Sequence, residues 1–135
     1  NEPCILMNLE NRSINDQAYT FMASVLVAVN PLKPLKNPDP KSLDPSTPHP
    51  YSVAENAFKQ MMFANDNTAF SIGESVNQSV VTSGESGAGK TESCKMVLRH
   101  LVESTGTGKS SAIDRMLLQS NSITESFGNA QTLRN

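Results

Sequence analysis

Apolar positions at helical spacing predict two amphipathic helices in this chain. The first runs from about Val53 to about Ala64, and an S-x-x-E capping box at Ser52 and Glu55 marks its start. Its apolar stripe consists of Ala54, Ala57, Phe58, Met61 and Met62. The second helix begins near Lys90 and carries its apolar residues at Cys94, Val97, Leu98, Leu101 and Val102. The opposite face of that helix is charged, with Glu92, Lys95, Arg99 and Glu103.

Two short aliphatic runs predict buried strands. The run at 24–29, SVLVAV, ends at Asn30-Pro31, where proline lacks the backbone donor that a sheet needs. The run at 79–83, SVVTS, is β-branched, as expected for a central strand of a parallel sheet.

The remaining segments are predicted to be shorter helices and loops. A short apolar helix covers about 4–9 and is followed by a polar turn up to 21. Seven of the eight prolines fall within 31–50, which predicts a surface loop, although a domain linker or a PxxP ligand has the same composition. We further expect a surface insertion at 63–74, a flexible Gly/Ser loop at 104–111 and an amphipathic helix from 113.

Composition narrows the classes of protein that fit. A chain of 135 residues with 37% hydrophobic content can fill one small domain. Its net charge of −2 gives no reason to expect a nucleic acid or an anionic membrane as partner, and no apolar run reaches membrane-spanning length. Cys4 and Cys94 lack metal-ligand spacing and are too few for a disulfide framework, so a reducing cytosolic setting is expected.

The segment 84–91 matches the phosphate-loop pattern G-x-x-x-x-G-K-S/T at every fixed position. It follows a predicted strand and precedes a predicted helix, which is the context that such a loop requires. The predicted nucleotide-binding residues are Gly84, Glu85, Ser86, Gly87, Ala88, Gly89, Lys90 and Thr91. A Gly/Ser-rich turn that binds nothing is the alternative interpretation.

Each residue type in this loop suits a phosphate ligand. The glycines allow successive N–H groups to turn inward around phosphate oxygens, and the helix that follows points its positive end at the same anion. Lys90 adds a mobile cation for the β- and γ-phosphates and is the predicted catalytic residue, while the Thr91 hydroxyl is a predicted Mg²⁺ ligand. Glu85 and Ser86 are expected to act through their backbone amides.

The longer stretch NQSVVTSGESGAGKTESCK at 77–95 resembles the phosphate-loop segment of the myosin motor domain. A second resemblance lies at 30–35, NPLKPL, which is similar to the myosin segment beside the adenine ring and makes Asn30 and Pro31 candidate base contacts. That family usually places a Tyr a few residues further on, whereas the next aromatic residue here is Tyr51. The third resemblance is the C-terminal stretch, where Arg134 and Asn135 look like the approach to the switch I loop and Asn135 matches its first phosphate-facing Asn.

These resemblances imply an α/β fold, namely a P-loop NTPase-type mixed sheet flanked by helices, incomplete in this chain. Residues 1–135 would be a partial myosin motor domain, truncated at both ends. The implied activity of the full-length protein is an actin-activated ATPase with ATP and Mg²⁺ as cofactors, in the cytoplasm at the actin cytoskeleton. Actin filaments would bind through regions absent from this chain, and a light chain or calmodulin would bind the missing lever. By itself the 135-residue chain is expected to lack ATPase activity, because the switch loops that complete the catalytic site are missing.

Two alternatives remain open at this point. One is a non-motor P-loop nucleotide-binding protein, such as a nucleotide kinase or a GTPase, although the guanine-specificity motif N-K-x-D is absent. The other is a nucleotide-dependent actin-binding scaffold that does not hydrolyse ATP.

Overall fold

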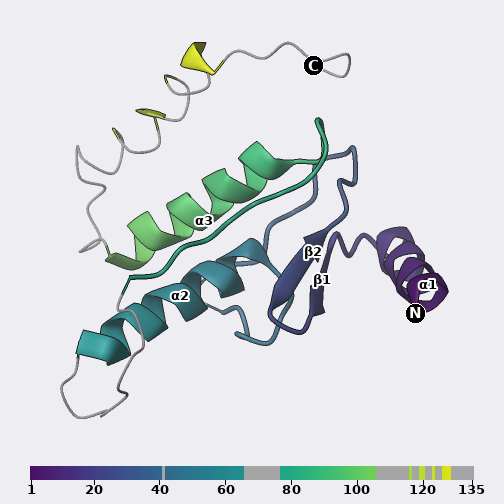
Figure 1. Cartoon of the computed structure of the whole chain (residues 1–135), viewed down its shortest axis with the longest axis horizontal. Helices are drawn as coiled ribbons and strands as arrows, with labels where there is room; N and C mark the ends of the chain where they lie inside the picture. Colours follow the sequence, from purple (N-terminus) through teal and green to yellow (C-terminus); the bar gives the residue numbers. More distant parts are fainter. Residues whose placement is uncertain are drawn as a thin grey trace.

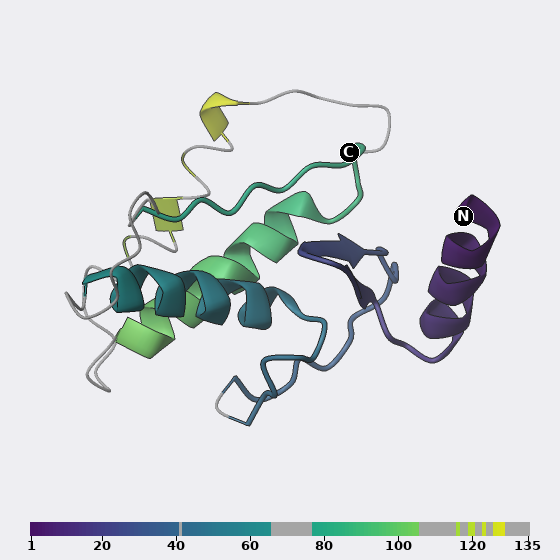
Figure 2. The ribbon, with the colours of Figure 1, turned by 60° about the horizontal axis from the view of Figure 1, so that its bottom comes forward.

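A computed structural model describes residues 1–40, 42–65 and 77–105, together with 116, 119–120, 123 and 126–128. Its helices and strands follow the order α1 (Glu2–Ile14), β1 (Tyr19–Met22), β2 (Val25–Ala28), α2 (Pro50–Asn65) and α3 (Lys90–Thr105). Figure 1 shows α2 and α3 side by side, with the β1–β2 hairpin at one end of the pair and α1 beyond the hairpin. Figure 2 shows the same arrangement from a second direction.

Helix α1 is longer than the predicted helix at 4–9, because both of its ends are capped by asparagine. The Asn1 side chain accepts a hydrogen bond from the Cys4 N–H at 3.3 Å, and the Asn15 side chain donates to the Asn11 carbonyl at 2.7 Å. No residue of α1 is buried. The side chain of Arg12 attaches the helix to the hairpin, since its Nε and Nη2 atoms donate to the Tyr19 carbonyl at 3.2 and 2.8 Å.

The sheet in the described part of the chain is an antiparallel hairpin of two strands. It is compatible with an incomplete α/β fold, but it contains no parallel pair of the predicted mixed sheet. Strand β2 lies within the predicted strand at 24–29, but it is half-exposed, and its partner β1 was predicted to be a polar turn. Tyr19 pairs with Ala28 and Met22 with Val25, which leaves a two-residue turn. A loop this short can only return the chain antiparallel.

Helices α2 and α3 pack through a small buried surface. Ala54 on α2 is fully buried, and Tyr51 and His100 are exposed by only 4% and 5%. The ring of Tyr51 stacks on that of His100, with 5.3 Å between their centroids. The side chain of Ala54 ends at Cβ, and its small size allows the two helices to pack closely at this position.

The predicted capping box of α2 is wrong. The helix begins at Pro50, with His49 as its cap: the Nδ1 atom of His49 accepts from the Tyr51 N–H at 3.2 Å. Proline suits the first helical position because its missing donor has no partner there. Ser52 lies inside the first turn and donates to the Thr47 carbonyl at 2.8 Å, while Glu55 binds His100 on α3.

The predicted strand at 79–83 is not a strand in the structure. Residues 77–85 are extended and run alongside α3 (Figures 1 and 2), but Val80 and Val81 are 41% and 86% exposed. A hydroxyl–thiol contact of 3.1 Å between Thr82 and Cys94 joins the segment to the helix. β-branched residues form a strand only when a neighbouring backbone supplies hydrogen bonds, and β2 does not pair with this segment.

Other predictions concern loops. The proline-rich segment is a loop as predicted over its described residues 31–40 and 42–48, and Pro50 then opens α2. Most of the predicted insertion at 63–74, most of the 104–111 loop and most of the helix from 113 lie outside the described residues. Among the described helices, none combines the length and apolar character needed to cross a membrane.

Candidate functional site

The loop at 84–91 has the backbone conformation that its glycines were predicted to permit. Gly84, Gly87 and Gly89 have φ angles of 155°, 77° and 93°. A Cβ atom at Gly89 would meet nothing within 4 Å, so its backbone angle, rather than space, requires glycine at that position. Helix α3 then begins at Lys90, as predicted, and the Ser93 N–H donates to the Gly89 carbonyl at 3.0 Å.

The ammonium group of Lys90 lies against the loop itself. Its Nζ atom donates to the carbonyls of Gly84 and Glu85, both at 2.7 Å. The Ala88 N–H also donates to the Glu85 carbonyl, at 3.3 Å. The cation and the loop amide therefore lie on the same side of Glu85, next to the first turn of α3. Thr91, the predicted Mg²⁺ ligand, is exposed in that turn.

Asn30, predicted from a distant part of the sequence, reaches this loop. Its Nδ2 atom donates to the Gly87 carbonyl at 2.7 Å, across 57 positions of sequence. Its Oδ1 atom accepts the Leu32 N–H at 3.0 Å, which closes a turn directly after β2. Two of the predicted segments are thus joined by one side chain.

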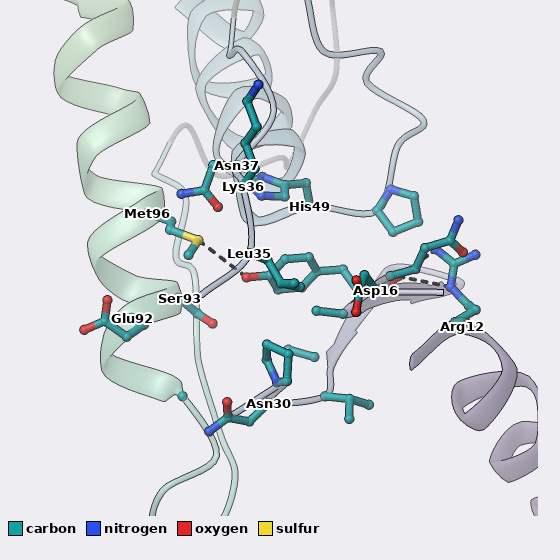
Figure 3. A pocket seen from close by; sticks show the side chains of 18 of the residues that line it. Arg12, Asp16, Asn30, Leu35, Lys36, Asn37, His49, Glu92, Ser93 and Met96 are labelled. Carbon is teal, nitrogen blue, oxygen red and sulfur yellow. Dashed lines mark hydrogen bonds between the residues drawn. The ribbon is translucent and has the colours of Figure 1, made fainter. Parts of the chain in front are cut away.

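A cavity of about 500 Å³ adjoins the loop between α3, the hairpin and the segment after β2 (Figure 3). Ala88 and Gly89 form its border with the loop, and Pro31 lines it, as does Asn30. Its further lining includes Tyr19, Leu35, Asn37, His49, Ser93 and Met96. Its size and mixed lining are suited to a heterocyclic ligand attached to a group bound by the loop.

A row of four rings extends from this cavity into the α2–α3 contact, and the sequence analysis assigned it no role. Tyr19 meets His49 edge to face at 5.0 Å, His49 meets Tyr51 at 4.4 Å, and Tyr51 stacks on His100. The Tyr19 hydroxyl contacts the Met96 sulfur at 3.4 Å. The only signal in the sequence was His49 before a proline, which is consistent with a helix cap but does not identify the neighbours of the ring.

Burial changes the proton affinities of this row. Desolvation, with a smaller contribution from the charge of His100, lowers the pKa of His49 to about 4. Burial, followed by the charge of Tyr51, raises the pKa of Tyr19. At the far end, the hydrogen bond from His100 to Glu55, at 3.0 Å, is the main reason why the pKa of Glu55 is lowered. His49 is therefore neutral near pH 7.

The residues present fit a nucleotide and a magnesium ion. Loop amides and Lys90 supply the positive potential that phosphates require, and the cavity adjoins them. No group of three or more His, Cys, Asp or Glu side chains suited to a metal occurs in the described residues. Mg²⁺ needs only one or two protein ligands, because phosphate oxygens and water complete its shell. Asn135 lies outside the described residues.

Comparison with known proteins identifies the family to which the chain belongs. The model of the myosin head (motor domain) family matches residues 1–135, and the chain belongs to that family. Its relatives include unconventional myosin-VI of Sus scrofa and of Homo sapiens. Each is 40% identical to this chain over 144 residues, and the alignment covers the whole of this chain. Myosin-13 of Arabidopsis thaliana is 38% identical over 145 residues. The chain spans about a tenth of the length of these relatives, 10% of myosin-VI and 9% of Myosin-13.

Proposed function

We propose that this chain is the nucleotide-binding part of an actin-based motor and that the loop at 84–91 binds the phosphates of Mg·ATP. The observation that carries the proposal is the geometry of this loop: three glycines with positive φ precede a helix, and the Lys90 ammonium binds the carbonyls of Gly84 and Glu85. Family membership supports the same function.

Within the site, the backbone amides of the loop and of the first turn of α3 stabilise the negative charge of the phosphates. Lys90 exchanges its two carbonyl acceptors for phosphate oxygens, so its contribution to binding is the difference between these two sets of hydrogen bonds. Thr91 would hold Mg²⁺ together with the phosphates, and the ion would supply positive charge for phosphoryl transfer. The adjoining cavity, whose lining includes Pro31 and His49, would hold the nucleoside.

The full-length protein is then an actin-activated ATPase of the actin cytoskeleton in the cytoplasm. Hydrolysis is coupled to actin binding and movement, with a light chain or calmodulin as a further partner. Asn135 is the other phosphate-facing side chain in this proposal. Family membership is the support for these partners and for this activity.

Replacement of Lys90 tests the proposal. In the full-length protein, Lys90→Ala removes a charge-assisted contact to phosphate and is expected to weaken Mg·ATP binding about a hundredfold. The measurement is equilibrium binding of a fluorescent ATP analogue. Lys95→Ala is the matched control, because Lys95 lies on the same helix and pairs with Glu92. Equal affinity of the Lys90 variant and the parent would overturn the proposal.

A further inference from the structure

Both polar atoms of the Asn30 carboxamide form hydrogen bonds. Its nitrogen donates to the Gly87 carbonyl at 2.7 Å, and its oxygen accepts from the Leu32 N–H at 3.0 Å. Leu32 has a φ of 53°, a left-handed conformation that is unfavourable for a residue with a Cβ. The turn after β2 is thus bent in a way that presents the Asn30 nitrogen to the loop.

This contact determines the direction of one peptide group in the loop. The described residues contain no cis peptide bond, so the Gly87 carbonyl and the Ala88 N–H point in opposite directions. The carbonyl is held toward Asn30, and the Ala88 N–H points to the Glu85 carbonyl, on the side where Lys90 Nζ also lies. A phosphate on this side would take the place of the Glu85 carbonyl as the acceptor of the Ala88 N–H and of Lys90, while the Gly87 carbonyl stays turned away.

We infer that Asn30 is a positioning residue for phosphate binding, which holds the Gly87–Ala88 peptide in the orientation that directs the Ala88 N–H at the ligand. The inference rests on the proposed function of the loop. It differs from a role of Asn30 as a contact of the base in the group that the side-chain donor holds, which is the Gly87 carbonyl. The loss of Asn30 should then affect every ligand that carries the phosphates, whether or not a base is attached.

The experiment measures binding of Mg·ATP and of magnesium pyrophosphate, which has no base, to the full-length protein. Asn30→Ala is expected to weaken both about tenfold, which is the usual effect of one lost hydrogen bond. Asn30→Asp keeps the oxygen that accepts from Leu32 but has no donor, and its charge faces the Gly87 carbonyl. We expect it to weaken both ligands more than Asn30→Ala does. Because it preserves the turn, this variant also decides the question if the alanine variant fails to fold.

Asn15→Ala is the matched control, since it removes an equivalent amide-to-carbonyl bond of 2.7 Å on α1, away from the loop. Its affinities should equal those of the parent. Parental affinity of both Asn30 variants for both ligands would overturn the inference and leave the proposed function intact. A loss confined to Mg·ATP would also overturn it, because it would identify Asn30 as a base contact. If the parent bound neither ligand, the proposed function would fall, and this inference with it.

Discussion

At the scale of single residues, backbone handedness shapes the site and its surroundings. In the described part of the chain, three glycines of the loop have positive φ, and so do three residues that carry a Cβ: Asp16, Ala23 and Leu32. Ala23 is the first residue of the two-residue hairpin turn, a position at which glycine is preferred when φ is positive. The chain therefore uses glycine in the loop but tolerates strain in the hairpin.

Ala23→Gly is expected to stabilise the hairpin by about 1 kcal/mol, because glycine adopts a positive φ without a steric penalty. Hydrogen exchange of the β1 and β2 amides measures this locally, and we expect it to slow about fivefold. Ser24→Gly is the control: Ser24 is the other turn residue and has no positive φ, so glycine there should not slow exchange. Faster exchange in the Ala23 variant would contradict the interpretation.

At the scale of elements, the start of α2 depends on a neutral imidazole. His49 accepts the Tyr51 N–H through Nδ1, which a proton on that atom would prevent. Burial and the charge of His100 lower the pKa of His49 to about 4, whereas an unfolded histidine titrates near 6.5. The folded state thus binds fewer protons than the unfolded state between these two values. The stabilising contribution is complete above pH 6.5 and is lost as the pH falls toward 4.

His49→Asn should remove much of this pH dependence while it retains a cap, since asparagine is a good N-cap residue. We expect the parent to lose about 2 kcal/mol of unfolding free energy between pH 7 and pH 4 from this group, and the variant to lose correspondingly less. Urea denaturation at a series of pH values provides the measurement. His49→Ala separates the loss of the cap from the loss of the titration. It should be less stable than His49→Asn at every pH, because alanine cannot cap the helix, but its stability should lack this pH dependence as well. If the unfolding free energy of either variant changed with pH as steeply as that of the parent, His49 would not be the group that titrates.

At the scale of the whole molecule, a few side chains connect the elements. The buried apolar residues in the described part of the chain are Ala18, Tyr51 and Ala54. Helix α1 depends on Arg12, the α2–α3 pair on Tyr51, His100 and Glu55, and the extended segment on Thr82. Such polar connections hold a relative position without burying much area. The loss of one of them should therefore release one element rather than unfold the rest.

Arg12→Ala should release α1 in this way, because it removes both donors to the Tyr19 carbonyl. We expect limited proteolysis between α1 and β1, at residues 15–18, to become about tenfold faster while α2 and α3 stay resistant. Arg12→Lys, which keeps one donor, should give an intermediate rate. Arg99→Ala, at an exposed position on α3, is the control. Unchanged cleavage in the Arg12→Ala protein would show that other contacts hold α1.

Local rules were sufficient to predict several features from the sequence. The body of α2, the start of α3 at Lys90 and the strand at 25–28 follow from residue spacing and from side chains a few positions apart. The three glycines of the loop predicted its positive φ angles, because glycine adopts such angles without a steric penalty. The family was also legible in the order of motifs, and the match over residues 1–135 confirms it. The nucleotide roles of 84–91 and Asn135 stay predictions.

The tertiary structure decided everything that needed a distant partner. Residues 79–83 have the composition of a strand, but no described strand pairs with them, whereas the unpredicted β1 is a strand because β2 lies opposite. The box at Ser52 and Glu55 predicted a cap, yet Glu55 binds His100 across 45 positions. The contact between the Asn30 donor and Gly87 was not predicted, and the role of Asn30 as a base contact stays a prediction. In each case the side chain or backbone could satisfy its hydrogen bonds in more than one way, and only the folded chain selected the partner.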